Sequence, residues 1–216
     1  MDILERFENI IKETANPIVF EIGCNDAYHT DMLNGITKKH HKDYRYFCFE
    51  PDDRVWCRIL PIEKKHKPFV LFSPFALCDR EGEITFHLSD GYESREGYQK
   101  QHFSGSSSIR KPTGCTKAWP DMKFYDKTVK CTTIDSFCKS KAVDHIDFIW
   151  MDTQGAEKDI FNGAKEMSPK IKYIYTEYEP NNYEGAAGLE EILLMLPNFE
   201  LVENYGGDVL LRNKDL

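Results

Sequence analysis

The chain has 216 residues, of which 41% are hydrophobic and 30% charged, a balance typical of a globular domain rather than a disordered chain. Its formal net charge of -8 argues against a general nucleic-acid-binding protein, because such proteins present a basic face. No apolar run reaches the roughly 18 residues of a membrane span, and the acidic, amphipathic N-terminus is unlike a signal peptide, so we expect no membrane association.

The N-terminal part of the chain alternates apolar runs at helical spacing with short apolar segments typical of strands. Turn-forming and polar residues, such as Asn16-Pro17 and Glu50-Pro51, separate these segments. The expected helices are 2–14, one from about residue 30, and 54–65, and the expected strands are 18–22, 44–49, 69–72 and 83–88.

The C-terminal part begins with a segment, 89–128, that has no steady periodicity and predicts a long loop. After it we expect strands over 129–134, 146–151 and 173–178, helices over 135–139, 156–166 and 189–196, and a closing hairpin of 199–204 and 208–212. Strands that alternate with helices predict an α/β fold with a doubly wound, mostly parallel sheet. No linker divides the chain, so we expect one domain over 1–216.

The seven cysteines are an odd number and form no C-x-x-C pair. Cys24, Cys48, Cys78 and Cys138 lie in or beside apolar runs, which predicts buried free thiols. Free thiols are typical of a reducing compartment, and we therefore expect a cytoplasmic protein.

Ligands on a doubly wound sheet bind beyond the carboxyl ends of its strands, so the residues after each strand are the candidate site. The first strand runs into EIGCNDA, residues 21–27, where Gly23 lets the backbone turn sharply and approach a ligand. Glu50 follows the second strand and could accept hydrogen bonds from both hydroxyls of a ribose. The alternatives are an ordinary strand–helix turn and a solvent-facing acid at a helix start.

Two further carboxylates follow neighbouring strands. Asp152 ends the apolar strand 146–151, and Glu177 ends the next strand along the chain. In a parallel sheet these two side chains should converge, where they could hold a divalent cation or perturb each other's pKa. A helix cap is the alternative role for Asp152.

The order and spacing of these motifs resemble the FkbM family of S-adenosylmethionine-dependent methyltransferases, from about residue 19 to residue 212. The family's D-x-G-A-N-x-G turn corresponds to EIGCNDA, and its acid-Pro pair to Glu50-Pro51. Its A-x-x-D-x-x-G stretch corresponds to residues 76–82, a Ser-rich element to 106–108, and its D-x-E-G-A-E motif to DTQGAE, residues 152–157.

The resemblance implies a class I methyltransferase fold, which is Rossmann-like, with a seven-stranded sheet that ends in an antiparallel hairpin and has helices on both faces. It also implies S-adenosylmethionine as cofactor and a hydroxyl of a sugar, a glycan or a glycosylated small molecule as methyl acceptor. Methylation of RNA or protein, and a non-catalytic nucleotide-binding module, are the alternatives, with RNA disfavoured by the acidic charge.

Carried over residue by residue, the resemblance places Gly23, Asn25 and Thr30 around the methionine part of the cofactor and Glu50 at the ribose. Asp79 and Ser107 would lie near the adenine. The full implied cofactor set is Glu21, Gly23, Asn25, Ala27, Thr30, Glu50, Asp79, Ser107 and Asp152.

Two positions depart from the family's pattern. Ala27 replaces a glycine, and Gln154 replaces a glutamate. Because an amide does not take up a proton near neutral pH, a general base must be another residue. We favour Asp152, followed by Glu179 and His29, with Glu177 and Asp208 as further candidates.

The predicted loop and the residues just after it are basic, although the chain as a whole is acidic. Residues 95–130 contain eight Lys and Arg residues and three acidic residues. Interleaved aromatic residues suggest a segment that could clasp an anionic acceptor and close over it as a lid. A solvated surface loop is the alternative.

Overall fold

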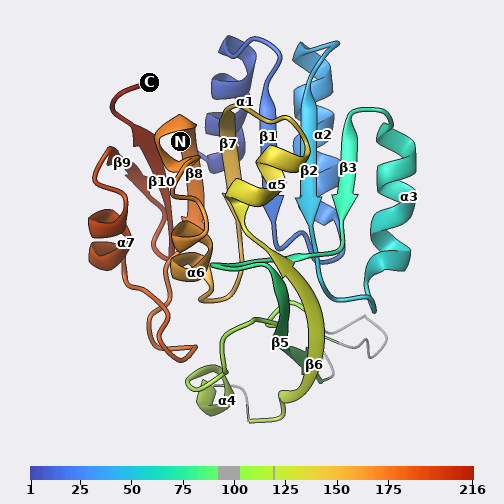
Figure 1. The fold of residues 1–216 in the computed structure, drawn as a ribbon, viewed down its shortest axis with the longest axis vertical. Helices are drawn as coiled ribbons and strands as arrows, with labels where there is room; N and C mark the ends of the chain where they lie inside the picture. The colour runs from blue at the N-terminus through green and yellow to red at the C-terminus, as the bar shows by residue number, and fades with distance from the viewer. Residues whose placement is uncertain (92–102, 119) are drawn as a thin grey trace.

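The computed structural model describes residues 1–91, 103–118 and 120–216 (Figure 1). Its main sheet has seven strands in the order β3-β2-β1-β7-β8-β10-β9. In that order the strands are Val70–Ser73, Arg45–Phe49, Ile18–Ile22, Ile146–Met151, Ile171–Glu177, Asp208–Asn213 and Phe199–Asn204. β10 pairs antiparallel with both β8 and β9, and all other pairs in this sheet are parallel, so the predicted, mostly parallel α/β sheet with a closing antiparallel hairpin is confirmed.

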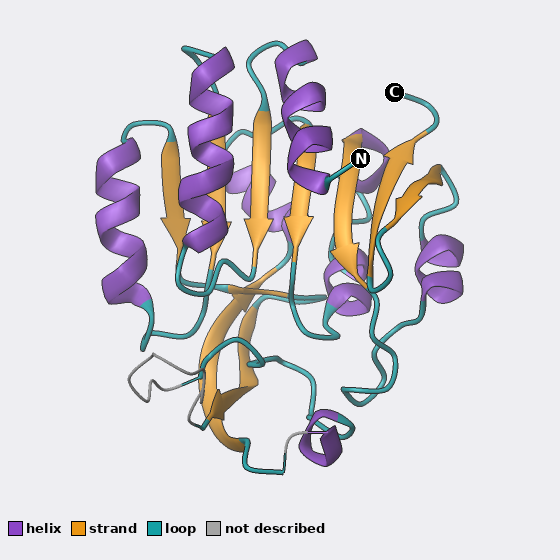
Figure 2. Cartoon of the chain, turned by 180° about the vertical axis from the view of Figure 1, so that it is seen from behind, coloured by secondary structure: helices purple, strands orange, loops and turns teal. Residues whose placement is uncertain are grey.

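Helices cover both faces of this sheet because the side chains of its buried strands alternate between two apolar cores. In β1, Phe20 packs against Phe137, with ring centroids 5.8 Å apart, whereas Val19 belongs to the opposite core with Phe7 and Leu33. The helices α1 Ile3–Glu13, α2 Tyr28–His40 and α3 Trp56–His66 cover the second face, which Figure 2 views from the front. The helices α5 Ile134–Ser140, α6 Glu157–Asn162 and α7 Leu189–Met195 cover the first.

A second sheet lies beyond the carboxyl ends of the main strands (Figures 1 and 2). It has the order β4-β6-β5, with β4 Ala76–Leu77, β5 Gly82–Asp90 and β6 Lys123–Thr132, and its strands β5 and β6 form a long antiparallel ribbon. The predicted loop over 89–128 is therefore wrong at both ends, where residues 89–90 and 123–128 pair as strands. Between them lies the short helix α4 Cys115–Ala118. The basic residues of the predicted loop include Arg95 and Lys100, which lie outside the described residues.

Most other predicted boundaries agree with the structure within a few residues. The main exception is α6, predicted over 156–166, which ends at Asn162 because the chain turns at Gly163. All seven cysteines are free, and the four predicted to be buried are buried. Among the described residues, no helix is both long enough and apolar enough to cross a membrane.

Candidate active site

The turn after β1 holds the ends of three strands together. Gly23 has φ +84°, and a Cβ atom there would lie 1.9 Å from the backbone oxygen of Asp152 at the end of β7. The N–H groups of Gly23 and Cys24 both donate to the carbonyl of Phe49 in β2, at 3.0 and 3.1 Å. The close approach predicted for Gly23 is thus an approach to the backbone of β7, and it requires a residue without a side chain.

The turn continues in the left-handed region. Asn25 has φ 42° and Ala27 has φ 64°, a conformation that costs an alanine more than a glycine. Ala27 precedes α2 and donates its N–H to the carbonyl of Cys24 at 2.8 Å. This geometry explains why the resembling motif has glycine at the position of Ala27.

Glu50 is fixed by the same turn and by the residues that follow β2. Its Oε2 accepts the N–H of Asn25 at 2.9 Å, and its Oε1 accepts the N–H of Asp52 at 2.8 Å. Burial raises the pKa of Glu50 to about 7, although these two hydrogen bonds oppose the shift. Each carboxylate oxygen keeps acceptor capacity for a further donor.

A cavity of about 320 Å³ lies along this edge of the sheet. In the order of the sheet, the loop after β7 is followed by the loops after β1, β2 and β3. The residues that line the cavity therefore run from Asp152 through Gly23 and Glu50 to Phe75. The end near β3 is mostly apolar, and includes Phe75, Ala76, Leu77, Phe86 and Ile109. Such a cavity suits a ligand with one flat apolar end and a polar remainder.

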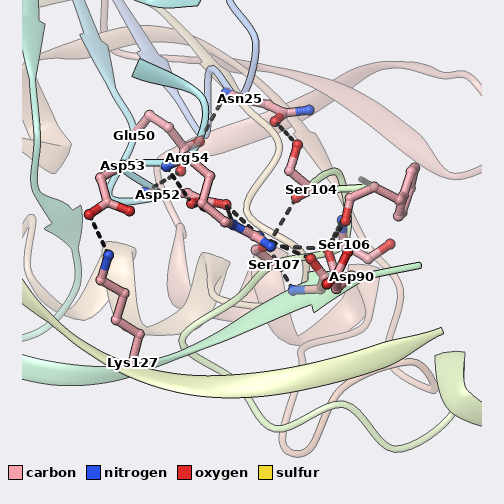
Figure 3. A network of polar contacts seen from close by, with 12 residues as sticks. Asn25, Glu50, Asp52, Asp53, Arg54, Asp90, Ser104, Ser106, Ser107 and Lys127 are labelled. Atoms are coloured by element: carbon pink, nitrogen blue, oxygen red, sulfur yellow. Dashed lines mark hydrogen bonds and ion pairs between the residues drawn. The ribbon is translucent and has the colours of Figure 1, made fainter. Parts of the chain in front are cut away.

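The ribbon of β5 and β6 is joined to the cavity by polar contacts (Figure 3). Ser104 donates its hydroxyl to Oδ1 of Asn25 at 2.7 Å. Arg54 forms an ion pair with the buried Asp52 at 2.6 Å and donates to the carbonyl of Ser89 in β5 at 2.9 Å. The loop that positions Glu50 is thereby connected to the ribbon.

Lys127 adds a second connection, from β6 to Asp53, with an Nζ–Oδ2 distance of 2.5 Å (Figure 3). Ser104 and Ser107 line the cavity from this side. The sequence pattern did not identify Ser104 as a site residue, because it lies in a segment without periodicity. The predicted lid falls partly on residues 92–102, which lie outside the described residues.

Asp152 and Glu177 converge, as the parallel register of β7 and β8 predicts. The side-chain amide of Gln154 lies between them, and its Nε2 donates to Asp152 Oδ1 at 2.7 Å and to Glu177 Oε2 at 2.8 Å. Its Oε1 accepts the hydroxyl of Tyr183 at 3.0 Å. Gln154 therefore supplies both carboxylates with the hydrogen-bond donors that a glutamate at this position would not provide when ionised.

Burial and the charge of Asp152 raise the pKa of Glu177 to about 9. The pKa of Asp152 is also raised by burial, while Gln154 and His29 lower it. The side chain of Asp152 is exposed and lines the cavity, whereas that of Glu177 is half-buried. Glu177 thus keeps its proton at neutral pH.

The prediction of a divalent cation at Asp152 and Glu177 is not supported. The amide of Gln154 binds both carboxylates in the place where a cation would bridge them. Within 1–91, 103–118 and 120–216, no group of three or more His, Cys, Asp or Glu side chains is arranged to hold a metal ion.

Several predicted site residues line the cavity and others do not. The lining includes Gly23, Asn25, His29, Glu50, Ser107 and Asp152. Outside it lie Glu21, Ala27, Thr30, Asp79, Glu177 and Glu179.

Glu21 and Thr30 lie behind the turn rather than in the cavity. Thr30 is fully buried and donates its hydroxyl to Glu21 at 2.6 Å, and Tyr46 donates to the same oxygen at 2.7 Å. These contacts fasten the start of α2 to β1 and β2, so both residues support the turn from behind. Burial raises the pKa of Glu21 to about 7.

Asp79 and Glu179 are also displaced from the cavity. Asp79 is exposed and pairs with Arg80 at 3.1 Å, so it is a turn residue before β5. Glu179 accepts a hydrogen bond from the amide of Asn182 at 3.1 Å. Neither contact places a carboxylate against the cavity lining.

Buried carboxyls should make the unliganded protein less stable as pH rises from 5 to 8. Burial raises the pKa of Glu157 to about 7, as it does for Glu21 and Glu50, so the folded state binds more protons than the unfolded state above pH 4.5. The free energy of unfolding therefore falls with increasing pH across this window. Urea denaturation at pH 5, 6, 7 and 8 measures it.

Glu157→Gln is the matched test, because Oε1 alone accepts both of the hydrogen bonds from Thr153 and Gly155 and is retained in glutamine. We expect a shallower decline of stability with pH, and a gain relative to the parent protein at pH 8. An unchanged slope would contradict the assignment of this dependence to the buried carboxyl.

The sequence and the fold were compared with known proteins. The profile of the methyltransferase FkbM domain matches residues 21–206. The chain is 37% identical over 214 residues to the 2-O-methyltransferase NoeI of Sinorhizobium fredii (strain NBRC 101917 / NGR234), in an alignment that covers 94% of this chain and 82% of NoeI.

The fold is also similar to a solved structure, that of a methyltransferase FkbM from Methylobacillus flagellatus KT. The TM-score is 0.56 at 13% sequence identity, and the superposition covers 92% of this chain. It covers 43% of the other chain, so the present chain spans less than half of that protein's length. At this identity the similarity supports the fold.

Proposed function

Because the chain belongs to the FkbM family of S-adenosylmethionine-dependent methyltransferases, we propose that it methylates a hydroxyl oxygen of a sugar or glycan. The relative NoeI is a 2-O-methyltransferase, which favours oxygen as the acceptor atom. The observation that carries the proposal is the buried carboxylate of Glu50, which two backbone N–H groups hold in the lining of the cavity.

The residues of the cavity fit S-adenosylmethionine from end to end. Glu50 would accept the ribose hydroxyls with the acceptor capacity that Asn25 and Asp52 leave free. The apolar end, with Phe75 and Ile109, would contact the adenine, and Ser107 lies beside it. Gly23, Asn25 and Asp152 then surround the methionine part, while Glu21 and Thr30 support their turn from behind.

When bound, S-adenosylmethionine would supply an electrophilic methyl group on its sulfonium, and the neutral thioether S-adenosylhomocysteine would be the leaving group when an acceptor oxygen attacks the methyl carbon. Asp152 is the general base: it accepts the proton of the acceptor hydroxyl as the oxygen–carbon bond forms. Gln154 orients this carboxylate, and Glu177 keeps its own proton and so leaves the negative charge on Asp152. His29 lines the cavity beside them, whereas Glu179 does not.

The function is tested with a labelled methyl donor and a panel of sugars, RNA and protein, after calorimetric titration with S-adenosylmethionine, S-adenosylhomocysteine and NAD. We expect binding of the first two and transfer of the label to a sugar hydroxyl. Transfer to RNA or protein alone would contradict the sugar assignment. Binding of NAD alone would contradict the cofactor assignment.

Glu50→Gln should weaken binding of S-adenosylmethionine about tenfold or more. Glutamine has one carbonyl oxygen, so it cannot accept from both backbone N–H groups and from the ribose hydroxyls. Calorimetry measures the Kd. The control is Glu83→Gln, the same change at an exposed position outside the cavity, which should leave the Kd unchanged. Equal affinity of the two variants would contradict the ribose role of Glu50.

A further inference from the structure

A second cavity, of about 390 Å³, adjoins the first. It lies between the N-terminal part of α1, the start of α2, and the strands β7, β8 and β10. Tyr28, His29 and Asp152 line both cavities. The proposed general base thus stands where the two cavities meet, with one cavity free to hold the acceptor.

One wall of the second cavity is aromatic. Trp150 and Tyr175 are neighbours in the parallel register of β7 and β8, with ring centroids 4.4 Å apart. His29 lies against Trp150 at 5.3 Å and against Tyr28 at 5.4 Å. Tyr28 is 69% exposed, which leaves it available to a ligand. Such rings offer flat apolar surface together with polar edges, as a sugar ring requires.

The charged groups of this cavity are acids. Asp2, Asp152 and Asp208 line it, and no Lys or Arg among the described residues does. Carboxylates accept hydrogen bonds from hydroxyl groups and repel anions. The cavity is therefore suited to a ligand rich in hydrogen-bond donors and free of negative charge.

The basic residues of segment 95–130 that the structure describes do not offset the acidic charge of the second cavity. Arg110 pairs with Asp159 at 2.5 Å, and Lys127 pairs with Asp53. None of the described basic residues of 95–130 lines either cavity. The expectation of an anionic acceptor thus has no support from these residues.

We propose that the second cavity is the acceptor subsite and that it selects a sugar ring without carboxylate, sulfate or phosphate groups. The ring packs against the exposed Tyr28, in the cavity that the largely buried Trp150 and Tyr175 also line. Asp208 accepts hydrogen bonds from hydroxyls that do not react, and the reacting hydroxyl gives its proton to Asp152. This inference rests on the proposed function.

The test compares Asp208→Asn and Tyr28→Ala with Asp144→Asn, a change of the same charge at an exposed position outside both cavities. The acceptor is whichever uncharged sugar the parent enzyme methylates. We expect the KM for that sugar to rise about tenfold in the first two variants, because each loses a contact to it. The Kd of S-adenosylmethionine should stay within about twofold in Asp208→Asn and Asp144→Asn, which lie outside the first cavity. Melting temperatures verify folding of all three variants.

A second arm compares that sugar with its uronic acid counterpart, for which we expect a kcat/KM at least about tenfold lower. Equal or better turnover of the uronate, or an unchanged KM in both Asp208→Asn and Tyr28→Ala, would overturn the acceptor subsite while leaving sugar methylation intact. Failure of the parent enzyme to methylate any sugar would overturn the proposed function and this inference together.

Discussion

Asp152→Asn is expected to lower kcat by about a hundred- to ten-thousandfold, the contribution of a positioned general base. Asparagine preserves the shape of the side chain and an oxygen that accepts from Gln154, but it does not take up a proton. The Kd of S-adenosylmethionine should change little, about threefold or less. Release of S-adenosylhomocysteine measures kcat, and calorimetry measures the Kd.

The control for this prediction is Asp26→Asn, which removes an acid from the lining of the first cavity without touching the carboxylate pair. It should retain most of the turnover. Near-normal turnover of Asp152→Asn would contradict the assignment of the base. In that case His29, which also lines both cavities, becomes the first candidate.

Gly23→Ala is expected to lower the free energy of unfolding by about 3 kcal/mol or more, as the sum of backbone strain and overpacking. The added Cβ would meet the carbonyl oxygen of Asp152, and φ at this residue is +84°. The backbone cannot easily shift, because Gly23 and Cys24 both donate to Phe49. Urea denaturation measures the effect.

Gly206→Ala separates the two causes of this loss. Gly206 has φ +90°, but a Cβ there would have no neighbour within 4 Å. It should therefore show only the cost of the left-handed backbone, about 1 kcal/mol. Equal destabilisation by the two variants would contradict the crowding between β1 and β7.

The sheet and its functional edge could be predicted from the sequence because each central strand is an apolar run that ends at a polar residue. Glu50 and Asp152 are far apart in the chain, yet the rule for parallel sheets predicts that they meet at one edge, and both line the same cavity. The closing hairpin could also be predicted, because Gly206 and Gly207 form a turn between two apolar segments.

The sequence predicted strands over 83–88 and 129–134, but it did not predict the full length of the ribbon that β5 and β6 form. The first half of β6, residues 123–128, is exposed on most of its positions, so it has no apolar face to give an alternating pattern. Ser104 and Arg54 act through contacts to distant segments, for which a local pattern holds no signal.

Two predicted site residues that lie outside the cavity lining show the same limit of a local sequence pattern. Glu21 lies in the turn motif and Thr30 follows it, but their side chains contact each other behind the cavity. Spacing along a chain identifies the turn without showing which side of it a side chain occupies. The bridging role of Gln154 likewise depends on Glu177, which is 23 residues further along the chain.

A crystal structure of the complex with S-adenosylhomocysteine tests the central claim most directly. We expect the ribose hydroxyls on the carboxylate of Glu50, the adenine at the apolar end, and the sulfur facing the junction of the two cavities beside Asp152. A nucleoside bound elsewhere, or a sulfur directed away from Asp152 and His29, would contradict this account.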